Sequence, residues 1–127
     1  IWILNTINKI WNEFEKKFLN LWQNSKTGDA YSEKFFNSDE QVKIKNERKI
    51  FLKKIFHDSI GFAAAKMIRR MFGFAHNIDL EWIKDEKIRA NCEIKCSNLA
   101  IKMMTNASDY KNIETLTEEA YKFDLND

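Results

Sequence analysis

Proline is absent from this sequence of 127 residues, and glycine occurs only three times. Proline interrupts helices and glycine weakens their interiors, so the scarcity of both favours long helices with few sharp turns. No alternation of apolar and polar residues typical of strands is present either. The hydrophobic content of 44% and the charged content of 31% are those of a globular chain. We therefore predict an all-α fold, with residues 1–127 forming a single helical region.

Cysteine and histidine are also scarce, with Cys92, Cys96, His57 and His76 as the only members. A spacing of four places the two cysteines on one helix, where a disulfide is disfavoured, and two thiolates alone do not make a zinc site. We therefore expect reduced thiols, an intracellular and specifically cytoplasmic protein, and no metal site. For His76, both a packing role and a role in lining a pocket are open.

Two further absences limit the partners. No apolar run reaches the roughly 18 residues of a membrane helix, and no signal-peptide pattern is present. The net charge of +2 is too small to indicate a nucleic-acid or membrane partner. The lysines of residues 43–54 are diluted by acidic residues, so they predict a solvated face. We expect neither nucleic acid nor membrane as a partner.

The first third of the chain combines a strong helical pattern with a polar connection. Apolar residues recur at steps of three and four, which predicts an amphipathic helix over residues 2–23. Its opposite face carries polar residues such as Asn8 and Asn12. Residues 25–39 form a polar connection with aromatic side chains, for which a short helical turn and an inserted loop both fit.

A second long helix is predicted from near residue 40 to Phe72. Ser38 and Asp39 are suitable N-caps, and Gly73 is a suitable C-terminal cap. Asp58 interrupts the apolar pattern, so one kinked helix and two helices that meet there are both compatible with the sequence.

Shorter helices are predicted in the last third. Asp79 is expected to cap a short turn over residues 80–84, and Asp85 to begin the next helix. Thr115 and Glu118 match a capping box that would begin the last helix. The inner stripe predicted for the helix after Asp85 consists of Ile88, Cys92, Cys96, Leu99 and Met103.

Two adjacent arginines, Arg69 and Arg70, lie in one of the most apolar stretches of the chain. A guanidinium binds the paired oxygens of a phosphate or carboxylate through two hydrogen bonds, so the pair indicates an anion site. Adjacent helical residues diverge by about 100°, and one arginine is therefore expected to reach a ligand while the other binds an internal acid. Alternatively, both arginines favour the negative end of the helix dipole. The small residues upstream, 61–65, predict a thin helical face for close packing.

Longer sequence patterns add a resemblance. Residues 58–76 read DSIGFAAAKMIRRMFGFAH, residues 78–93 read IDLEWIKDEKIRANCE, and residues 7–22 read INKIWNEFEKKFLNLW. These segments resemble the C-terminal helical region of 5-methylthioribose kinases, and the likeness covers residues 1–104. The sequence departs from the family pattern at Ala64, at Phe74 and at residues 94–95.

The resemblance implies the fold of protein kinases and aminoglycoside phosphotransferases. It implies transfer of the γ-phosphoryl group of ATP, with Mg²⁺, to the 1-hydroxyl of S-methyl-5-thioribose in methionine salvage, by an enzyme that forms homodimers. By the same resemblance, Arg69 and Arg70 contact substrate and phosphate, and His76 is a further candidate. The catalytic base, the metal-binding acid and the nucleotide-binding lobe would precede Ile1. We therefore expect no catalytic residue in this segment, and no activity from it without the remainder of a kinase chain.

A free-standing helical protein–protein interaction domain without catalysis is the alternative function. In that case, aromatic side chains such as Trp2, Trp11 and Trp22 would form the contact surface.

Overall fold

The computed structural model describes residues 1–25, 37, 40–74 and 78–125. Every regular element in these ranges is helical and none is a strand, which confirms the predicted all-α class. The elements are α1 (Trp2–Asn24), α2 (Gln41–Phe72), α3 (Ile78–Glu81), α4 (Glu86–Thr105), the 3-10 turn η3 (Ala107–Asp109) and α5 (Ile113–Leu125).

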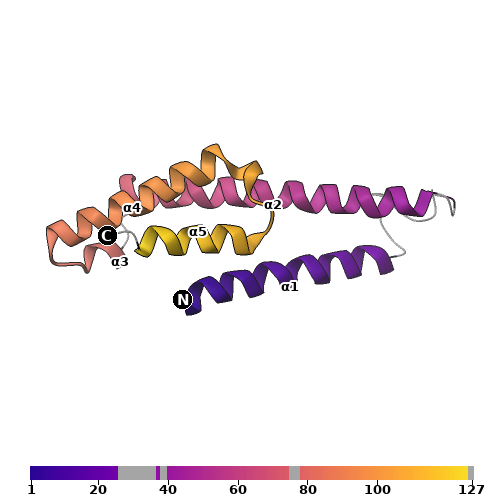
Figure 1. The fold of residues 1–127 in the computed structure, drawn as a ribbon, viewed down its shortest axis with the longest axis horizontal. Coiled ribbons are helices and arrows are strands. Elements are labelled where there is room, and N and C mark those ends of the chain that lie inside the picture. The colour runs from indigo at the N-terminus through magenta and orange to yellow at the C-terminus, as the bar shows by residue number, and fades with distance from the viewer. Residues whose placement is uncertain (26–36, 38–39, 75–77, 126–127) are drawn as a thin grey trace.

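The long helix α2 is the axis of the molecule (Figure 1). Helix α4 packs along its C-terminal half, and η3 also packs against it. Helix α5 then returns between α4 and α1 and contacts both of them. Helix α1 begins beside α5 and extends toward the N-terminal end of α2 (Figure 1). No helix in the described ranges combines the length and the apolar character needed to cross a membrane.

Helix α2 runs without interruption for 32 residues, a length of about 48 Å. The alternative of two helices meeting at Asp58 is therefore wrong, because Asp58 points to solvent and leaves the buried side of the helix intact. The buried residues recur strictly at every fourth position. They are Ile44, Arg48, Leu52, Phe56, Ile60 and Ala64.

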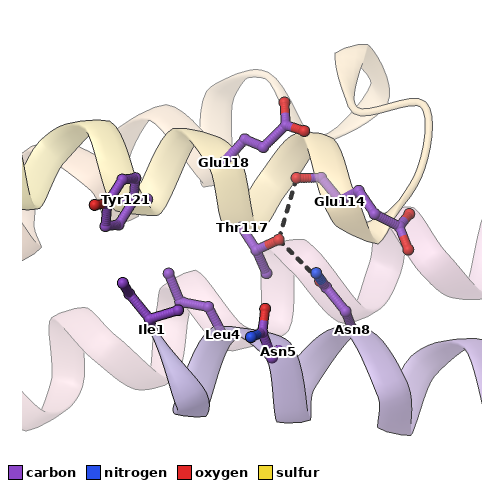
Figure 2. A pocket seen from close by; sticks show the side chains of 8 residues that line it. All are labelled: Ile1, Leu4, Asn5, Asn8, Glu114, Thr117, Glu118 and Tyr121. Atoms are coloured by element: carbon purple, nitrogen blue, oxygen red, sulfur yellow. Dashed lines mark hydrogen bonds between the residues drawn. The ribbon is translucent and has the colours of Figure 1, made fainter.

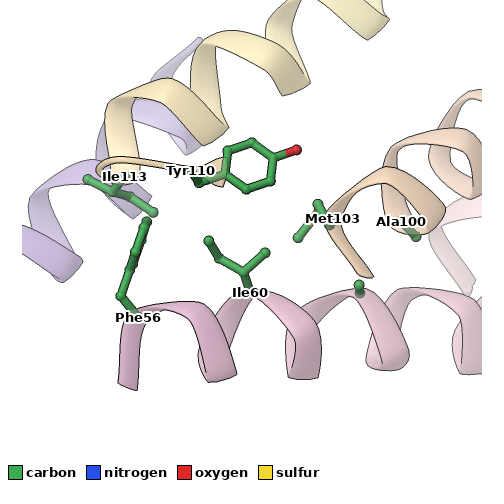
Figure 3. Close-up of a cluster of buried hydrophobic side chains, with 7 residues drawn as sticks. Phe56, Ile60, Ala100, Met103, Tyr110 and Ile113 are labelled. Atoms are coloured by element: carbon green, nitrogen blue, oxygen red, sulfur yellow. The ribbon is translucent and has the colours of Figure 1, made fainter. Parts of the chain in front are cut away.

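The main core lies between the C-terminal half of α2 and the elements that follow it (Figure 3). Helix α2 contributes three side chains and α4 two, and the chain after η3 supplies the rest. The members are Phe56, Ile60, Ala64, Ala100, Met103, Tyr110 and Ile113. Ala64 and Ala100 are completely buried, which allows α2 and α4 to approach closely.

The thin packing face predicted over residues 61–65 is reduced to a single residue. Ala64 is buried, whereas Ala63 and Ala65 are exposed. A Cβ atom added at Gly61 would contact no neighbouring atom. Consecutive helical residues point about 100° apart, so a run of small residues cannot form one face.

The observed N-termini of the helices agree only partly with those predicted from the sequence. Asp85 caps α4 as predicted, because its carboxylate accepts the backbone N–H groups two and three residues later. The predicted box of Thr115 with Glu118 is wrong. The observed box lies three residues earlier: Asn112 Oδ1 accepts the Thr115 N–H at 3.0 Å, and Thr115 Oγ1 accepts the Asn112 N–H at 3.4 Å. Asp79 lies within α3 instead of preceding it, and the N-caps proposed at residues 38 and 39 fall outside the described residues.

Polar side chains of α1 lie at the seam with α5 (Figure 2). Thr117 is buried, and its hydroxyl donates to Asn8 Oδ1 at 2.8 Å. One turn further, Asn12 Nδ2 donates to Glu114 Oε1 at 2.7 Å. These hydrogen bonds fix the register of α5 on α1.

The apolar side of α1 is only partly covered. Trp11 and Trp22 pack their rings against Phe56 and Phe51 of α2. In contrast, Ile3, Ile10 and Leu21 are 56%, 65% and 71% exposed. An amphipathic helix that hydrogen-bonds through its polar side while exposing apolar side chains has a surface suited to a further contact.

A polar network joins α4, η3 and α5 at the edge of the core. Tyr110 is buried, and its hydroxyl donates to the Glu119 carboxylate, which also pairs with the Lys102 ammonium. Burial and the hydrogen bond to Glu119 raise the pKa of Tyr110. Burial alone would raise the pKa of Glu119, but the hydrogen bonds from Lys102 and Tyr110 outweigh it, and the pKa is lowered.

The network predicts a loss of stability at both ends of the pH scale. Because the folded state favours protonated Tyr110, its contribution to stability is complete below the ordinary tyrosine pKa of 10.0 and is lost as the pH rises above it. Because the folded state favours ionised Glu119, its contribution is present above the ordinary pKa of 4.5 and is lost as the pH falls below it.

Urea unfolding between pH 3 and pH 11 measures both effects. In Tyr110→Phe, the free energy of unfolding should fall less steeply with rising pH above pH 10. In Glu119→Gln, it should fall less steeply with falling pH below pH 4.5. Slopes in both variants equal to those of the unmodified chain would contradict the network.

Candidate functional site

The predicted arginine pair lies at the C-terminal end of α2, in an open hollow. Arg69 and Arg70 are both exposed, and the hollow they line has a volume of about 520 Å³. Lys66, Met67 and Ala63 complete its lining. The structure therefore brings three cationic side chains of one helix to one concave surface.

The spacing of the three cations explains their convergence. Lys66 stands three residues before Arg69 and four before Arg70, so it is a helical neighbour of both. The expectation that one arginine would bind an internal acid is wrong for the described part of the chain, where both are exposed and neither forms an ion pair with a carboxylate. Like charges at this spacing repel one another, and an anion bound between them would relieve the repulsion.

Lys66 was not predicted from the sequence as a member of this site. Its ammonium lies over the Phe62 ring, 5.8 Å from the ring centroid. A cation–π contact of this kind orients the lysine while leaving its charge accessible. The signal that could have identified it was its spacing of three and four residues from the arginine pair.

Gly73 is the C-cap of α2 and follows Arg70 by three residues. Its backbone N–H donates to the Arg69 carbonyl at 2.9 Å, and its φ of −90° is accessible to any residue. Glycine is favoured here by space, because a Cβ atom would overlap the Arg69 carbonyl oxygen. The predicted cap is thus confirmed, with close approach rather than a left-handed backbone as its physical reason.

The histidines do not add to the described site. His57 Nε2 lies 3.2 Å from the Tyr110 carbonyl, to which it donates, and therefore ties α2 to the chain after η3. His76 falls outside the described residues. Within those residues, no group of three or more His, Cys, Asp or Glu side chains is arranged to hold a metal ion.

Exposed apolar side chains lie in the segment that follows the hollow. Phe72, Phe74, Ile78 and Trp82 are all largely open to solvent. A second apolar surface, a groove of about 470 Å³, is lined by α1, α2 and the start of α5. Ala63 lines both this groove and the cationic hollow, so the two are adjacent on α2.

Comparison with known proteins identifies relatives along almost the whole chain, although no family model matches it. Methylthioribose kinase 2 and methylthioribose kinase 1 of Oryza sativa subsp. japonica are 39% and 38% identical to it over 125 residues. Each match covers 97% of this chain and 29% of the relative. The methylthioribose kinase of Escherichia coli O45:K1 (strain S88 / ExPEC) is 29% identical over 119 residues, or 94% of this chain and 28% of the relative.

These matches confirm the resemblance found in the sequence: nearly the whole of this all-helical chain is similar to one part of the methylthioribose kinases. The match also extends beyond the residues 1–104 expected from the motifs, to 97% of the chain. The chain spans less than a third of the length of the relatives it matches.

The two glycines of α2 and its cap provide a matched pair of substitutions. Gly73→Ala should lower the free energy of unfolding by about 1–3 kcal/mol, because the new methyl group overlaps the Arg69 carbonyl. Gly61→Ala should raise it by about 0.5–1 kcal/mol, because a Cβ there meets no atom and alanine favours a helix interior.

Urea unfolding of both variants at one pH measures the difference. Equal effects of the two substitutions would show that the close approach at Gly73 does not constrain the end of α2.

Proposed function

We propose that this chain is the C-terminal helical part of an ATP-dependent kinase that phosphorylates the 1-hydroxyl of S-methyl-5-thioribose in methionine salvage. The observation that carries the proposal is the 39% identity to a methylthioribose kinase over 97% of the chain. The cationic hollow at the end of α2 lies within the matched region and provides chemistry suited to such a reaction.

In this proposal Arg69 and Arg70 contact the sugar substrate and the transferred phosphate. Phosphoryl transfer is catalysed mainly by positioning and by stabilising charge on the phosphoryl oxygens. A guanidinium suits this task because it presents two N–H donors to two oxygens and keeps its charge at every physiological pH. Both side chains are exposed and so can reach a ligand held by other parts of an enzyme.

The remaining chemistry would come from the rest of a longer chain. The described residues include no cluster of acidic groups arranged to hold Mg²⁺. By the resemblance, a catalytic base, the ATP site and the metal ligands are assigned to residues outside this segment, which alone should not transfer phosphate. His76 remains a candidate substrate contact by resemblance.

The apolar groove supports the same assignment. It is lined by Ile7, Ile10 and Phe14 of α1, together with side chains of α2 and α5. Because the relatives are more than three times as long as this chain, we propose that the remainder of the kinase covers this groove. That arrangement would bury the apolar side chains of α1, which are exposed here.

A helical interaction domain without catalysis is the second candidate, favoured by the same exposed apolar surface. Of the three tryptophans expected to form its contact surface, only Trp2 is largely exposed, because Trp11 and Trp22 pack against α2. Under this alternative, the groove would bind another protein, and the arginines would have no role in turnover.

A chimeric enzyme separates the two candidates. In it, this chain replaces the matching segment of the rice methylthioribose kinase 2, and phosphorylation of methylthioribose by ATP is measured. The chimera should be active, and Arg69→Ala or Arg70→Ala should each lower kcat/KM by about 100-fold or more, the range for removing one transition-state contact. Lys54→Ala, at an exposed lysine on the same helix, is the control and should leave turnover unchanged.

Two results would count against the proposal. A folded chimera without activity would favour the interaction domain. An active chimera whose arginine variants both keep near-normal turnover would retain the kinase assignment but remove the arginines from the site.

A further inference from the structure

A second, smaller hollow lies between α4 and α5 and contains both cysteines of the chain. Its volume is about 190 Å³. Both thiols are free and half-buried. The other side chains that line it are Lys95, Leu99, Ala120 and Phe123. Residues of α4 and α5 line this hollow, and none of them belongs to the arginine pair or its surroundings. The proposed kinase function assigns no role to these residues.

The spacing of the thiols suits a bridging ion better than a disulfide. Residues four apart on a helix have Cβ atoms about 5–6 Å apart, whereas a disulfide requires about 3.5–4.5 Å. A linear sulfur–metal–sulfur unit spans twice a metal–thiolate bond, roughly 4–5 Å for bonds close to the 2.3 Å of zinc thiolates. Cys92 and Cys96 both line the hollow, and rotation about their Cα–Cβ bonds can change the separation of the sulfur atoms without moving the helix.

The surroundings favour a soft ion of low charge. Thiolates select soft cations such as Cu(I), and a linear Cu(I) site needs only two sulfur ligands. Zn²⁺ requires four ligands, and the described residues offer no such set. Leu99, Ala120 and Phe123 make the wall apolar, which disfavours hard, strongly hydrated ions. A bis-thiolate Cu(I) unit carries one negative charge, and Lys95, which also lines the hollow, would bring a positive charge to it.

We propose that Cys92 and Cys96 form a two-sulfur binding site for Cu(I). On binding, two S–H bonds break, two S–Cu bonds form and two protons are released to solvent, with no change in oxidation state. Because each thiol must lose its proton to bind the ion, the affinity increases with pH.

A competition titration of the 127-residue chain with Cu(I), without oxygen and against a chromophoric chelator, tests the site. One Cu(I) per chain is expected, with two protons released. Cys92→Ser and Cys96→Ser should each weaken binding by at least 100-fold. Met104→Leu is the matched control, because it removes an exposed sulfur outside the hollow, and its affinity should equal that of the unmodified chain.

A second probe tests the geometry in the unmodified protein, independently of whether the serine variants fold. Phenylarsine oxide joins two nearby thiols through two S–As bonds and loses its oxygen as water, giving a neutral product. It should bind one per chain and abolish Cu(I) binding. Lys95→Gln should weaken Cu(I) several-fold and leave the neutral arsenical adduct unchanged.

The site is refuted if the arsenical does not bridge the thiols, or if Cu(I) still binds with undiminished affinity after it has done so. Cu(I) affinity within threefold of the unmodified value in either folded serine variant would refute it as well. None of these measurements depends on kinase activity.

Discussion

The buried stripe of α2 is the constraint on which the rest of the structure depends. Its members recur every four residues, and each step advances the stripe around the helix axis by about 40°. Over the twenty residues from Ile44 to Ala64, the stripe therefore turns through roughly half a revolution. One straight helix can thus contact α1 through its first half, where Arg48 lies 5.6 Å from the Trp22 ring, and α4 through its second half.

The same winding determines where the cationic hollow can be. The fully buried positions end at Ala64, and beyond it Met67, Ile68 and Met71 pack against the core while only partly buried. Arg69 and Arg70 follow within two turns, on backbone that the Ala64 contact with α4 and the cap at Gly73 hold in place. Side chains on a rigid helix end can be positioned more accurately than side chains on a loop. The hollow is therefore open to a ligand and supported by the core at the same time.

Periodicity was sufficient to predict α1 and the extent of α2, because apolar spacing reports the helix directly. It could not predict which side of α1 meets α5, because the observed seam depends on hydrogen bonds of Asn8 and Asn12, which apolar spacing does not report. The buried position of Arg48 was hidden for a similar reason. Its neighbours in sequence, Glu47 and Lys49, are charged and exposed, and only the four-residue register to Ile44 and Leu52 places Arg48 inside.

The alternative role of the arginine pair is to neutralise the negative end of the helix dipole. This role can be judged by comparing the charge at the helix end with the charge of the cations near it. A helix C-terminus carries the equivalent of about half a negative elementary charge. Lys66, Arg69 and Arg70 bring three positive charges to one hollow, without an ion pair to any carboxylate of the described residues. The dipole can balance only a small part of that charge. Solvent and counterions screen the rest, unless a phosphate group binds there as we propose.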